Sequence, residues 1–353
     1  MLRLMNALNE LMKQGIADEA FPGAVCAIVK PNQVILREAW GLADPESKTP
    51  AAIDTIYDIA SLTKPITVTA VGLLIERGKL CLDQMVTYWL PEAEHLAAVT
   101  LRQLITHTSG LPSWKDYFQV GRNKKAILDA VYATPLEAMP GQRYCYSDVG
   151  YILLGAIIET VVRQPLNDFL RQNLFEPLGM NDTSYLPNQS LKSRFAVTGH
   201  CVTRLNQTLK GEVHDANTAT MGGVAGHAGL FSAINDLIIF AQTILNEGQF
   251  EGKRILSPAT LREMATNQNA PNIEAHTFGW FAYPNGYHPR ADLLSRQSFG
   301  HTGFTGTVMV FDPAIKSALI LLTNRIYSDP EAARFPLYRK RILNIMAAIA
   351  SEM

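Results

Sequence analysis

The chain has 353 residues, of which 47% are hydrophobic and 18% are charged. This length suits two domains or one large domain with an insertion, and the composition provides apolar residues for a sizeable core. Lysine and arginine (31) nearly balance aspartate and glutamate (32), which leaves a formal net charge of −1. No basic run is present, so the charge gives no indication of binding to nucleic acid or to a membrane surface.

The four cysteines are widely spaced and form no Cys-x-x-Cys pair, so the sequence predicts neither a zinc site nor a disulfide framework. No apolar stretch reaches the ~20 residues that a membrane-spanning helix needs. The first residues, 1–13, lack the apolar core of a secretory signal. As written, the sequence therefore indicates a cytoplasmic protein, or a periplasmic one if an export signal was removed.

The N-terminal part predicts a helix followed by a hairpin. Residues 2–16 show the helical spacing of an amphipathic helix. The β-branched run 23–29, a polar turn at 31–33 and a second run at 34–40 then predict two antiparallel strands. An irregular segment leads on to the next helix.

A buried helix is predicted to start near Ser61. Asp58 and Ser61 offer capping oxygens, Pro65 falls in the first turn, and Gly78 stands where a helix would stop. The residues between are apolar on nearly every side, as expected of a core helix. Ser61 and Lys64 are three residues apart, so one helical turn places their side chains on the same face.

This Ser-x-x-Lys spacing is typical of an activated serine nucleophile. A serine hydroxyl is a weak nucleophile unless a neighbour accepts its proton, and a lysine can do so only if burial or nearby cations lower its pKa. The start of a helix would also place backbone N–H groups where they can stabilise an oxyanion. Two residues at a fixed spacing also arise by chance, so this motif alone does not establish the chemistry.

The middle of the chain is predicted to be mainly helical, with loops that border a cleft. Tyr146 and Asp148 precede a helix over 149–162, and loops that end at a helix start often carry functional groups. The glycine-rich segment 211–229 holds two histidines and Asp215. No His-x-x-x-His spacing is present, so a loop that borders the cleft is favoured over a metal site.

The C-terminal part predicts a return to strands. Residues 278–283, 305–311 and 317–323 are rich in β-formers, and 335–349 has the pattern of a closing helix. Strands at both ends of a chain with helices between them indicate an α+β fold. We expect one antiparallel sheet built from both termini and flanked by helices, with an inserted, mostly helical region.

This arrangement divides the chain into two domains. Residues 1–60 and 270–353 are expected to form the sheet domain, and residues 61–269 the helical domain. The active site would lie at their junction.

Three short motifs occur in a fixed order. They are Ser61-x-x-Lys64, Tyr146-Ser147-Asp148 and His301-Thr302-Gly303. In order, spacing and surroundings they resemble the signature motifs of the penicillin-recognising serine hydrolases. That superfamily holds class C β-lactamases, low-molecular-weight D-Ala-D-Ala carboxypeptidases and β-lactamase-like esterases, and the likeness spans most of the chain. It implies a β-lactamase/transpeptidase-like fold.

The resemblance implies catalytic roles for three residues. Ser61 matches the nucleophile that forms the acyl-enzyme, and Lys64 matches the lysine that helps to activate it. Tyr146 matches the tyrosine that carries a proton between the nucleophile and the leaving group. The implied reaction is acyl transfer through a covalent intermediate, with no cofactor and no metal.

The resemblance also implies groups that hold the substrate. The backbone N–H groups of Ser61 and Phe304 match the oxyanion hole. His301, Thr302 and Gly303 match a strand triad, usually Lys-Thr-Gly, that flanks the cleft. Thr302 would bind a substrate carboxylate.

Two positions depart from the family pattern. Asp148 replaces the usual asparagine, so it lacks the amide donor; we expect its carboxylate to pair with Lys64, favour the charged lysine and leave more of the proton transfer to Tyr146. His301 replaces the usual lysine with a group mostly neutral near pH 7, as in the carboxypeptidase and esterase branches. Arg325, after the last strand, could supply a cation for a carboxylate; the alternative is a solvated strand end.

The sequence therefore predicts a serine hydrolase with an acyl-enzyme at Ser61, of the D-alanyl-D-alanine carboxypeptidase-like, penicillin-binding kind. The alternative activities are a carboxylesterase and a class C-like β-lactamase. The non-enzymatic alternative is a catalytically weak protein that binds a peptide or β-lactam, which Asp148 favours and the intact Ser61, Lys64 and Tyr146 oppose. The expected partner is a D-Ala-D-Ala peptide, a β-lactam or an ester, with no nucleic acid and no transmembrane segment.

Overall fold

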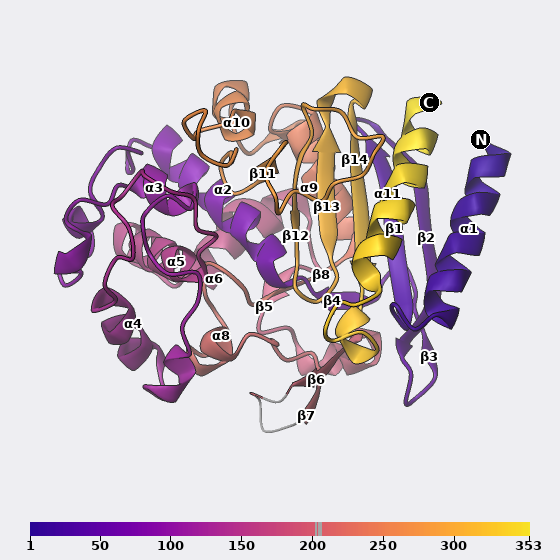
Figure 1. Ribbon diagram of the computed structural model, residues 1–353, viewed down its shortest axis with the longest axis horizontal. Coiled ribbons are helices and arrows are strands. Elements are labelled where there is room, and N and C mark those ends of the chain that lie inside the picture. The colour runs from indigo at the N-terminus through magenta and orange to yellow at the C-terminus, as the bar shows by residue number, and fades with distance from the viewer. Residues whose placement is uncertain (202, 204–206) are drawn as a thin grey trace.

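In a computed structural model, the chain forms an antiparallel sheet with helices on both faces and a helical region beside it (Figure 1). The structure describes residues 1–201, 203 and 207–353. Its α-helices are α1 (Leu2–Ala17), α2 (Thr63–Glu76), α3 (Leu101–Ile105), α4 (Lys124–Tyr132), α5 (Asp148–Val162), α6 (Leu166–Leu170), α7 (Glu176–Leu178), α8 (Ala216–Thr220), α9 (Ile234–Leu245), α10 (Pro258–Ala265) and α11 (Phe335–Ser351).

The main sheet has the strand order β11-β12-β13-β14-β1-β2-β3 over the described residues. Its strands are β1 (Gly23–Lys30), β2 (Gln33–Asp44), β3 (Thr49–Pro50), β11 (Phe281–Ala282), β12 (Phe299–Thr302), β13 (Val308–Asp312) and β14 (Ser317–Thr323). In its centre β1 pairs antiparallel with β14, so that Cys26 lies opposite Leu321. The predicted α+β fold, with one sheet built from both termini, is confirmed.

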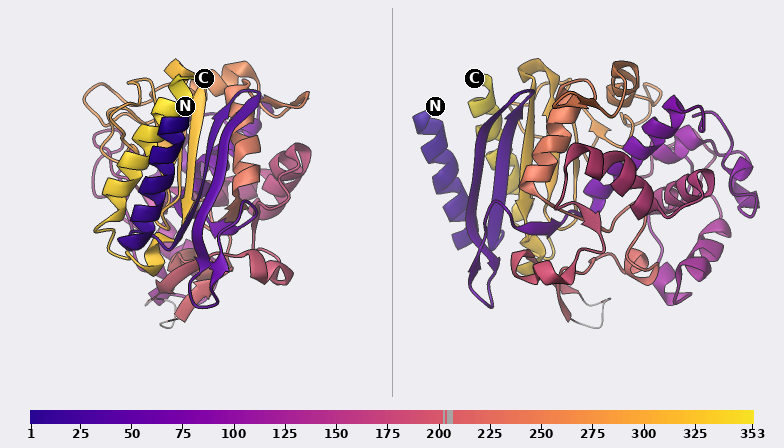
Figure 2. Two further views of the ribbon diagram at one scale, coloured as in Figure 1. Left: turned by 90° about the vertical axis from the view of Figure 1, so that its right-hand side faces the viewer. Right: turned by 180° about the vertical axis from the view of Figure 1, so that it is seen from behind.

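Helices cover both faces of this sheet (Figure 2). In β1, Cys26 and Ile28 belong to the apolar cluster under α1 and α11, whereas Val25 and Ala27 belong to the cluster that contains α9. Side chains alternate between the two faces of a strand, so both sets are buried. This explains why the central strands are apolar along their whole length.

Smaller strands connect the sheet side to the helical region. They are β4 (Ile56–Asp58), β5 (Ser184–Tyr185), β6 (Val197–Cys201), β7 (Gln207–Lys210), β8 (Leu230–Ala233), β9 (Gln249–Phe250) and β10 (Lys253–Arg254). β8 pairs antiparallel with both β4 and β5. The end of the glycine-rich segment is thereby held beside the strand that leads to Ser61.

The helix predicted after Ser61 is α2, and it is a core helix. Its residues from Thr63 to Leu74 are all buried, and Gly78, with φ of 64°, follows its end as predicted. The start differs from the prediction, because Ser61 lies in a 3₁₀ turn, Ala60–Leu62, and the α-helix begins at Thr63. Ser61 does not cap this helix with its side chain, whereas Asp58 Oδ1 accepts from the N–H of Ala60 in the turn before it.

Two strand predictions need correction. The strand predicted at 278–283 is reduced to β11, and the strand predicted at 305–311 begins only at Val308. Gly306 has a φ of 100° in the turn that precedes Val308, which excludes extended backbone there. The strand β12, which carries His301, has a glycine inside and no β-branched run, so strand propensity did not reveal it.

The division into two domains stays a prediction. Helix α9 falls within the range 61–269, yet it packs against β1 and β14 of the main sheet. Over the described chain, no single helix is long and apolar enough to cross a membrane; α5 passes that test only jointly with residues 166–178, from which it is bent by 73°.

Candidate active site

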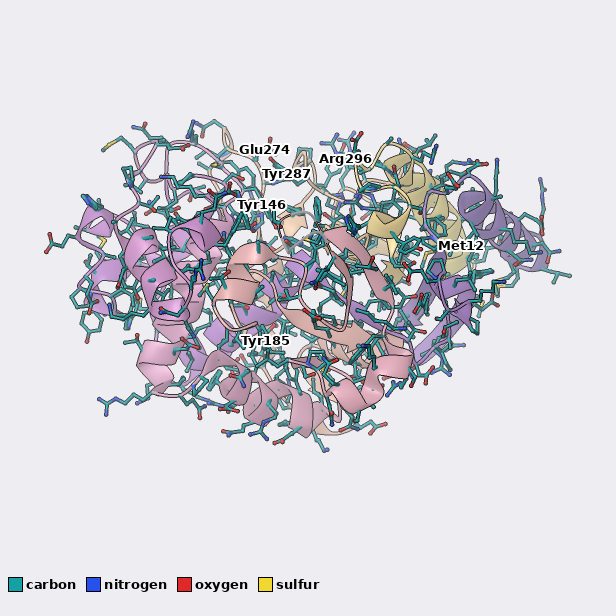
Figure 3. All side chains as sticks on the ribbon, turned by 90° about the horizontal axis from the view of Figure 1, so that it is seen from below. Met12, Tyr146, Tyr185, Glu274, Tyr287 and Arg296 are labelled. Atoms are coloured by element: carbon teal, nitrogen blue, oxygen red, sulfur yellow. The ribbon has the colours of Figure 1, made fainter. Side chains whose placement is uncertain are left out.

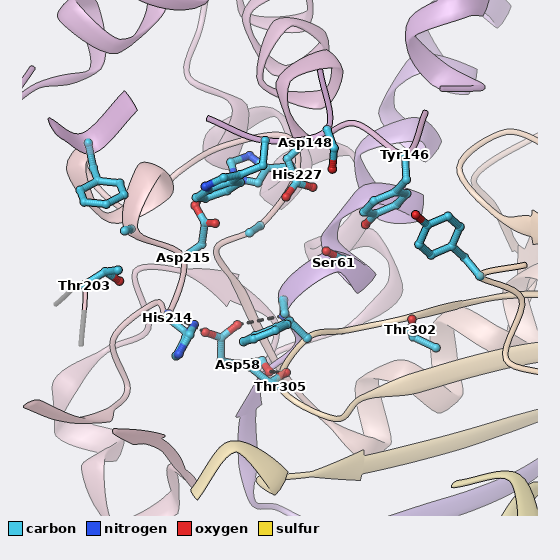
Figure 4. A pocket seen from close by; sticks show the side chains of 18 of the residues that line it. Asp58, Ser61, Tyr146, Asp148, Thr203, His214, Asp215, His227, Thr302 and Thr305 are labelled. Carbon is cyan, nitrogen blue, oxygen red and sulfur yellow. Dashed lines mark hydrogen bonds and ion pairs between the residues drawn. The ribbon is translucent and has the colours of Figure 1, made fainter. Parts of the chain in front are cut away.

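A cavity of about 580 Å³ opens where the sheet edge meets the helical region. Ser61 lines it, together with residues of the loop 113–118, the segment before α5, the glycine-rich segment 214–228 and the end of β12 (Figure 4). Both loops that the sequence indicated as borders of a cleft therefore contribute to this cavity. Tyr146 and Tyr287 lie side by side between the helices and the sheet (Figure 3).

The backbone around Ser61 is held by close contacts with the β12–β13 turn. A Cβ atom on Gly303 would lie only 2.6 Å from the carbonyl oxygen of Ile59, so this approach requires glycine. Thr307 Oγ1 donates to the same carbonyl at 3.0 Å, and Thr305 Oγ1 donates to the carbonyl of Asp58 at 2.7 Å. These contacts place the end of β12 against the turn that carries the predicted nucleophile.

Lys64 is fully buried, and three acceptors surround its ammonium group. Its Nζ lies 2.9 Å from Ser61 Oγ, 3.3 Å from the carbonyl oxygen of His227 and 2.5 Å from Asp148 Oδ1. It also lies 4.7 Å from the centre of the Tyr146 ring. The pairing expected between Lys64 and Asp148 is confirmed.

Burial dominates the protonation of this group of side chains. It lowers the pKa of Lys64, although the neighbouring Asp148 carboxylate acts in the opposite direction. Burial also raises the pKa of Tyr146 well above its usual value, and the Asp148 charge adds to this rise, whereas the hydrogen bond with Ser61 opposes it. Tyr146 is therefore a neutral phenol at physiological pH.

One wall of the cavity, which we call the imidazole wall, surrounds Tyr146. Its ring centre lies 4.6 Å from that of His107, 5.9 Å from that of His301 and 5.4 Å from that of Tyr287. The three histidines His107, His276 and His301 are fully buried.

Each of these histidines is neutral at physiological pH. Burial and the Lys64 charge lower the pKa of His301 well below 6.5 and that of His276 to about 3. Burial and the neighbouring cationic groups also lower the pKa of His107 well below 6.5. The expected neutrality of His301 therefore has a structural cause, namely full burial beside a lysine.

The hydrogen bonds of the imidazole wall assign tautomers. His301 Nδ1 donates to the carbonyl of Thr302 at 2.8 Å, so Nε2 of the neutral ring is an acceptor. His107 Nδ1 accepts from the N–H of Ser147 at 2.9 Å, which ties the end of α3 to the start of α5. At that start, Ser147 is the N-cap, and its Oγ accepts from the N–H of Gly150.

The opposite wall, which we call the acidic wall, holds Asp58, Asp215 and His227. Asp58 Oδ2 accepts from the N–H of His214 at 2.8 Å, yet burial raises the pKa of Asp58 to about 6. Asp215 Oδ1 lies 2.9 Å from His227 Nε2. Burial alone would raise the pKa of Asp215, but His227 and Thr218 outweigh it and lower that pKa to about 2.

The predicted substrate-binding residues are not all at the cavity surface. Asp148, Thr302 and the half-exposed Phe304 line it, as predicted. His301 is fully buried and stacks on Phe281 at 4.3 Å, so it faces the core of the imidazole wall. Gly303 acts through its missing side chain, as the close contact with Ile59 shows.

Arg325 does not lie at a solvated strand end and does not line the cavity. It is 5% exposed, and its guanidinium donates to the carbonyl groups of Phe304, Asp329 and Pro330. Its position gives no support to the expectation that it offers a cation to a substrate carboxylate. Arg325 instead anchors the Phe304 backbone beside the cavity.

The predicted oxyanion donors, the N–H groups of Ser61 and Phe304, are both carried by residues that line the cavity. In the described part of the chain, neither N–H donates to another group. Both are therefore available to a substrate oxygen, which is the property that an oxyanion hole requires.

Several residues of the site have no motif in the sequence. His276, Trp114 and Phe118 lie in no sequence motif, and His276 is one of the three buried histidines of the imidazole wall. Asp215 and His227 both lie in the segment 211–229, where a metal site was the less favoured prediction. In the structure these two side chains pair with each other. The described residues contain no group of three His, Cys, Asp or Glu side chains placed to hold a metal ion.

The chain resembles known proteins over nearly its whole length. A family model described as Beta-lactamase matches residues 8–342. A "Putative D-alanyl-D-alanine carboxypeptidase" of Escherichia coli (strain K12) is 31% identical over 373 residues, which cover 93% of this chain and 84% of that protein.

Solved structures share the fold at lower identity. EstCE1, a hydrolase with promiscuous acyltransferase activity, is 23% identical with a TM-score of 0.78 and covers 97% of this chain and 98% of its own. A β-lactamase/D-alanine carboxypeptidase from Pseudomonas syringae is 21% identical with a TM-score of 0.76, again over 97% and 98% of the two chains. Together with the family model and the curated relative, these matches show that the chain belongs to the β-lactamase family of serine hydrolases.

Proposed function

We propose that this chain hydrolyses its substrate through an acyl-enzyme on Ser61 and acts as a D-alanyl-D-alanine carboxypeptidase-like, penicillin-binding enzyme. The observation that carries the proposal is the geometry at the cavity floor. Ser61 Oγ lies 2.9 Å from Lys64 Nζ and is a hydrogen-bond partner of Tyr146. A nucleophile with two proton-carrying neighbours is what acyl transfer requires.

In this proposal each group acts at a defined step. Ser61 Oγ attacks the carbonyl carbon of the substrate while its proton passes to Lys64 Nζ, and the N–H groups of Ser61 and Phe304 stabilise the oxygen that becomes negative. Tyr146, a neutral phenol in the free protein, donates a proton to the departing group. Water then hydrolyses the Ser61 ester by the reverse proton route.

The substrate class rests on likeness and on the cavity. A relative at 31% identity carries the name of a D-Ala-D-Ala carboxypeptidase, which favours a peptide with that ending. Thr302 lines the cavity where the family pattern places a carboxylate-binding hydroxyl. A β-lactam would then acylate Ser61 because it presents a strained amide to the same groups.

A carboxylesterase is the second candidate, and the aromatic lining of the cavity favours it. Trp114, Phe118, Phe281, Tyr287 and Phe304 all contribute to that lining. The guanidinium of Arg325 is occupied by carbonyl groups and does not reach this surface. An apolar ester would use the aromatic lining and would need no cation.

Intact-protein mass spectrometry separates these candidates. The protein is incubated with a penicillin and, separately, with a serine-directed fluorophosphonate, and Ser61→Ala is the matched control. A persistent penicillin adduct on Ser61 supports the carboxypeptidase-like enzyme. A fluorophosphonate adduct alone leaves an esterase or a fast β-lactamase, which loss of penicillin from the tube distinguishes. No adduct from either reagent contradicts the nucleophile and favours a binding protein.

A further inference from the structure

The Lys64–Asp148 pair differs from an ordinary ion pair because it lies at the predicted nucleophile. Lys64 is fully buried, and the Asp148 side chain is 20% exposed at the cavity surface. Asp148 Oδ1 is itself buried, and in the described chain it has no hydrogen-bond partner beyond its contact with Lys64. The backbone of Asp148 is held by its N–H, which donates to the carbonyl of Ser113 at 2.9 Å.

The surroundings of Lys64 define its state before the reaction. An ammonium group has three N–H donors and no acceptor, and Lys64 has three acceptors within reach, which are Ser61 Oγ, the His227 carbonyl and Asp148 Oδ1. As an ammonium group, Lys64 hydrogen-bonds to Ser61 Oγ and the His227 carbonyl and forms an ion pair with Asp148 Oδ1, and it has no lone pair to offer Ser61. Lys64 in this state cannot accept the serine proton.

Tyr146 cannot accept the proton of Ser61 either. It is a neutral phenol, packed against the neutral histidines His107 and His301. A phenol that has kept its proton cannot deprotonate Ser61. The ionised base nearest to Lys64 is the carboxylate of Asp148, at 2.5 Å.

We propose that Asp148 accepts a proton from Lys64 during acylation, so that the pair, rather than a free lysine amine, deprotonates Ser61. This inference rests on the proposed function and adds a residue to it. Because an asparagine cannot accept a proton, Asp148 gives this chain a proton acceptor that the usual family pattern lacks. Asp148 acts through Lys64 and is a positioning residue.

The proton transfers balance. Lys64 passes one proton to Asp148 Oδ1, the Oγ–H bond of Ser61 breaks, and that proton replaces the lost one on Lys64 Nζ. At the same time Ser61 Oγ forms its bond to the carbonyl carbon. The leaving group then departs with a proton relayed through Tyr146 from Lys64, and Asp148 returns its proton to Lys64. No proton is exchanged with solvent in this sequence.

Other ionisable groups face the pair from every neighbouring segment. Tyr146 and Tyr151 lie with their ring centres 4.7 Å and 5.7 Å from Lys64 Nζ, and Asp215 acts on it electrostatically. The remaining groups around the pair are the histidines His107, His227, His276 and His301.

The protonation of most of these groups is fixed between about pH 6 and 8. His107, His276 and His301 stay neutral, the two tyrosines keep their protons, and Asp215 stays ionised. His227 contacts Lys64 through its carbonyl and pairs with Asp215 through its ring, so the experiment includes His227→Gln to separate its contribution.

The test is the pH profile of acylation by p-nitrophenyl acetate in rapid mixing, compared between wild type and Asp148→Asn. We expect a flat wild-type profile between about pH 6 and 8, because no proton is lost to solvent. In Asp148→Asn only the free amine of Lys64 can act, so the rate should fall about tenfold per pH unit below the pKa of Lys64, which the loss of the Asp148 charge lowers further. Asp129→Asn, which removes the carboxylate of a lysine–aspartate pair outside the cavity, should keep the flat profile.

Several outcomes would overturn the inference. A profile in Asp148→Asn that is flat at the wild-type rate would overturn the inference, because Asp148 would then add nothing to the deprotonation of Ser61. If the wild-type rate varied with pH and became flat only in His227→Gln, the pH dependence would be assigned to the histidine.

If Asp148→Asn does not fold, a proton inventory on wild type decides whether Asp148 takes up a proton. Two protons in flight give a rate that depends on deuterium content along a curve, and one proton gives a straight line. Wild type that forms no Ser61 adduct would overturn the proposed function as well.

Discussion

The two walls of the cavity hold ionisable side chains in opposite ways. The imidazole wall contains three histidines and Tyr146, and burial keeps all four neutral. The acidic wall contains Asp58, Asp215 and His227, and there backbone N–H groups and a histidine act as partners of the carboxylates. Figure 4 shows Tyr146 and Asp215 on opposite sides of Ser61.

The difference shows how burial and hydrogen bonding divide the protonation states around one nucleophile. A buried group without a charged partner becomes neutral, whereas a buried carboxylate that accepts several hydrogen bonds can stay ionised. The imidazole wall therefore supplies a protonated phenol, and the acidic wall keeps negative charge near Lys64. The first three of the following predictions each change one wall and leave the other in place.

Tyr146→Phe should have the largest effect, because it removes the only hydroxyl that the imidazole wall offers to Ser61 among the described residues. We expect turnover of an ester to fall by about 10²–10⁴-fold, the usual range for general acid–base catalysis. The fold should be retained, since the ring still packs against His107 and Tyr287. Steady-state kinetics and circular dichroism check both statements, and turnover within a few-fold of wild type would exclude Tyr146 as the proton carrier.

Asp58→Asn tests the part of the acidic wall in which burial prevails. The pKa of Asp58 is raised to about 6 in the folded chain, above the value of the unfolded chain, so the ionised carboxylate costs stability above about pH 6. As the pH falls from about 6 to 4, wild type should gain on the order of 3 kcal/mol relative to the variant. Urea unfolding at both pH values measures this, and a pH-independent difference would contradict it.

Asp215→Asn should show the opposite sign. The pKa of Asp215 is lowered to about 2, so its ionised form stabilises the fold above the unfolded pKa and this stability is lost as the pH falls through about 2. At pH 7 the variant should be less stable by about 2 kcal/mol, and the difference should shrink in acid. If the stability difference between variant and wild type changed in the same direction with pH for both aspartate variants, the contrast within the acidic wall would be refuted.

Ser61, Lys64 and Tyr146, the residues proposed for catalysis, could be selected from the sequence because each lies in a short motif with a local geometric meaning. Ser61 and Lys64 are one turn apart, and the contact between their side chains at 2.9 Å follows from that spacing. The sheet was predictable because β1 and β14 are mostly apolar runs that are buried along nearly their whole length. The sequence pattern was sufficient for prediction where the interacting residues are close in the chain or where a whole strand is buried.

The walls themselves were not predictable, because they depend on contacts between distant segments. His276 meets His107 across 169 residues of chain, with ring centres 4.8 Å apart, and neither stands in a motif. The partners of Asp58 include the N–H of His214, which lies 156 residues away. Arg325 follows a strand, which suggested solvent, but the residues that cover it belong to the turn before α11. Such partners appear only when the chain is folded.

Phe304→Ala should have the smallest effect of these substitutions. Phe304 lies between the two walls, so this variant tests a position that belongs to neither. Its ring is half exposed, 5.5 Å from His214 on one side and 5.0 Å from the guanidinium of Arg325 on the other. Stability should change by less than about 0.5 kcal/mol, as is usual for an exposed side chain. The backbone N–H of residue 304 remains, so kcat should stay the same.

The KM of the variant for an aryl ester should rise instead, by about 3- to 10-fold, because the substrate loses apolar contact in the ground state and the transition state alike. Steady-state kinetics of Phe304→Ala beside Phe304→Leu, which keeps an apolar side chain, measure this separation. A fall in kcat with an unchanged KM would mean that the ring positions the oxyanion donor. The side chain and the backbone of residue 304 would then act as one unit, and the aromatic lining could not be treated as a binding surface alone.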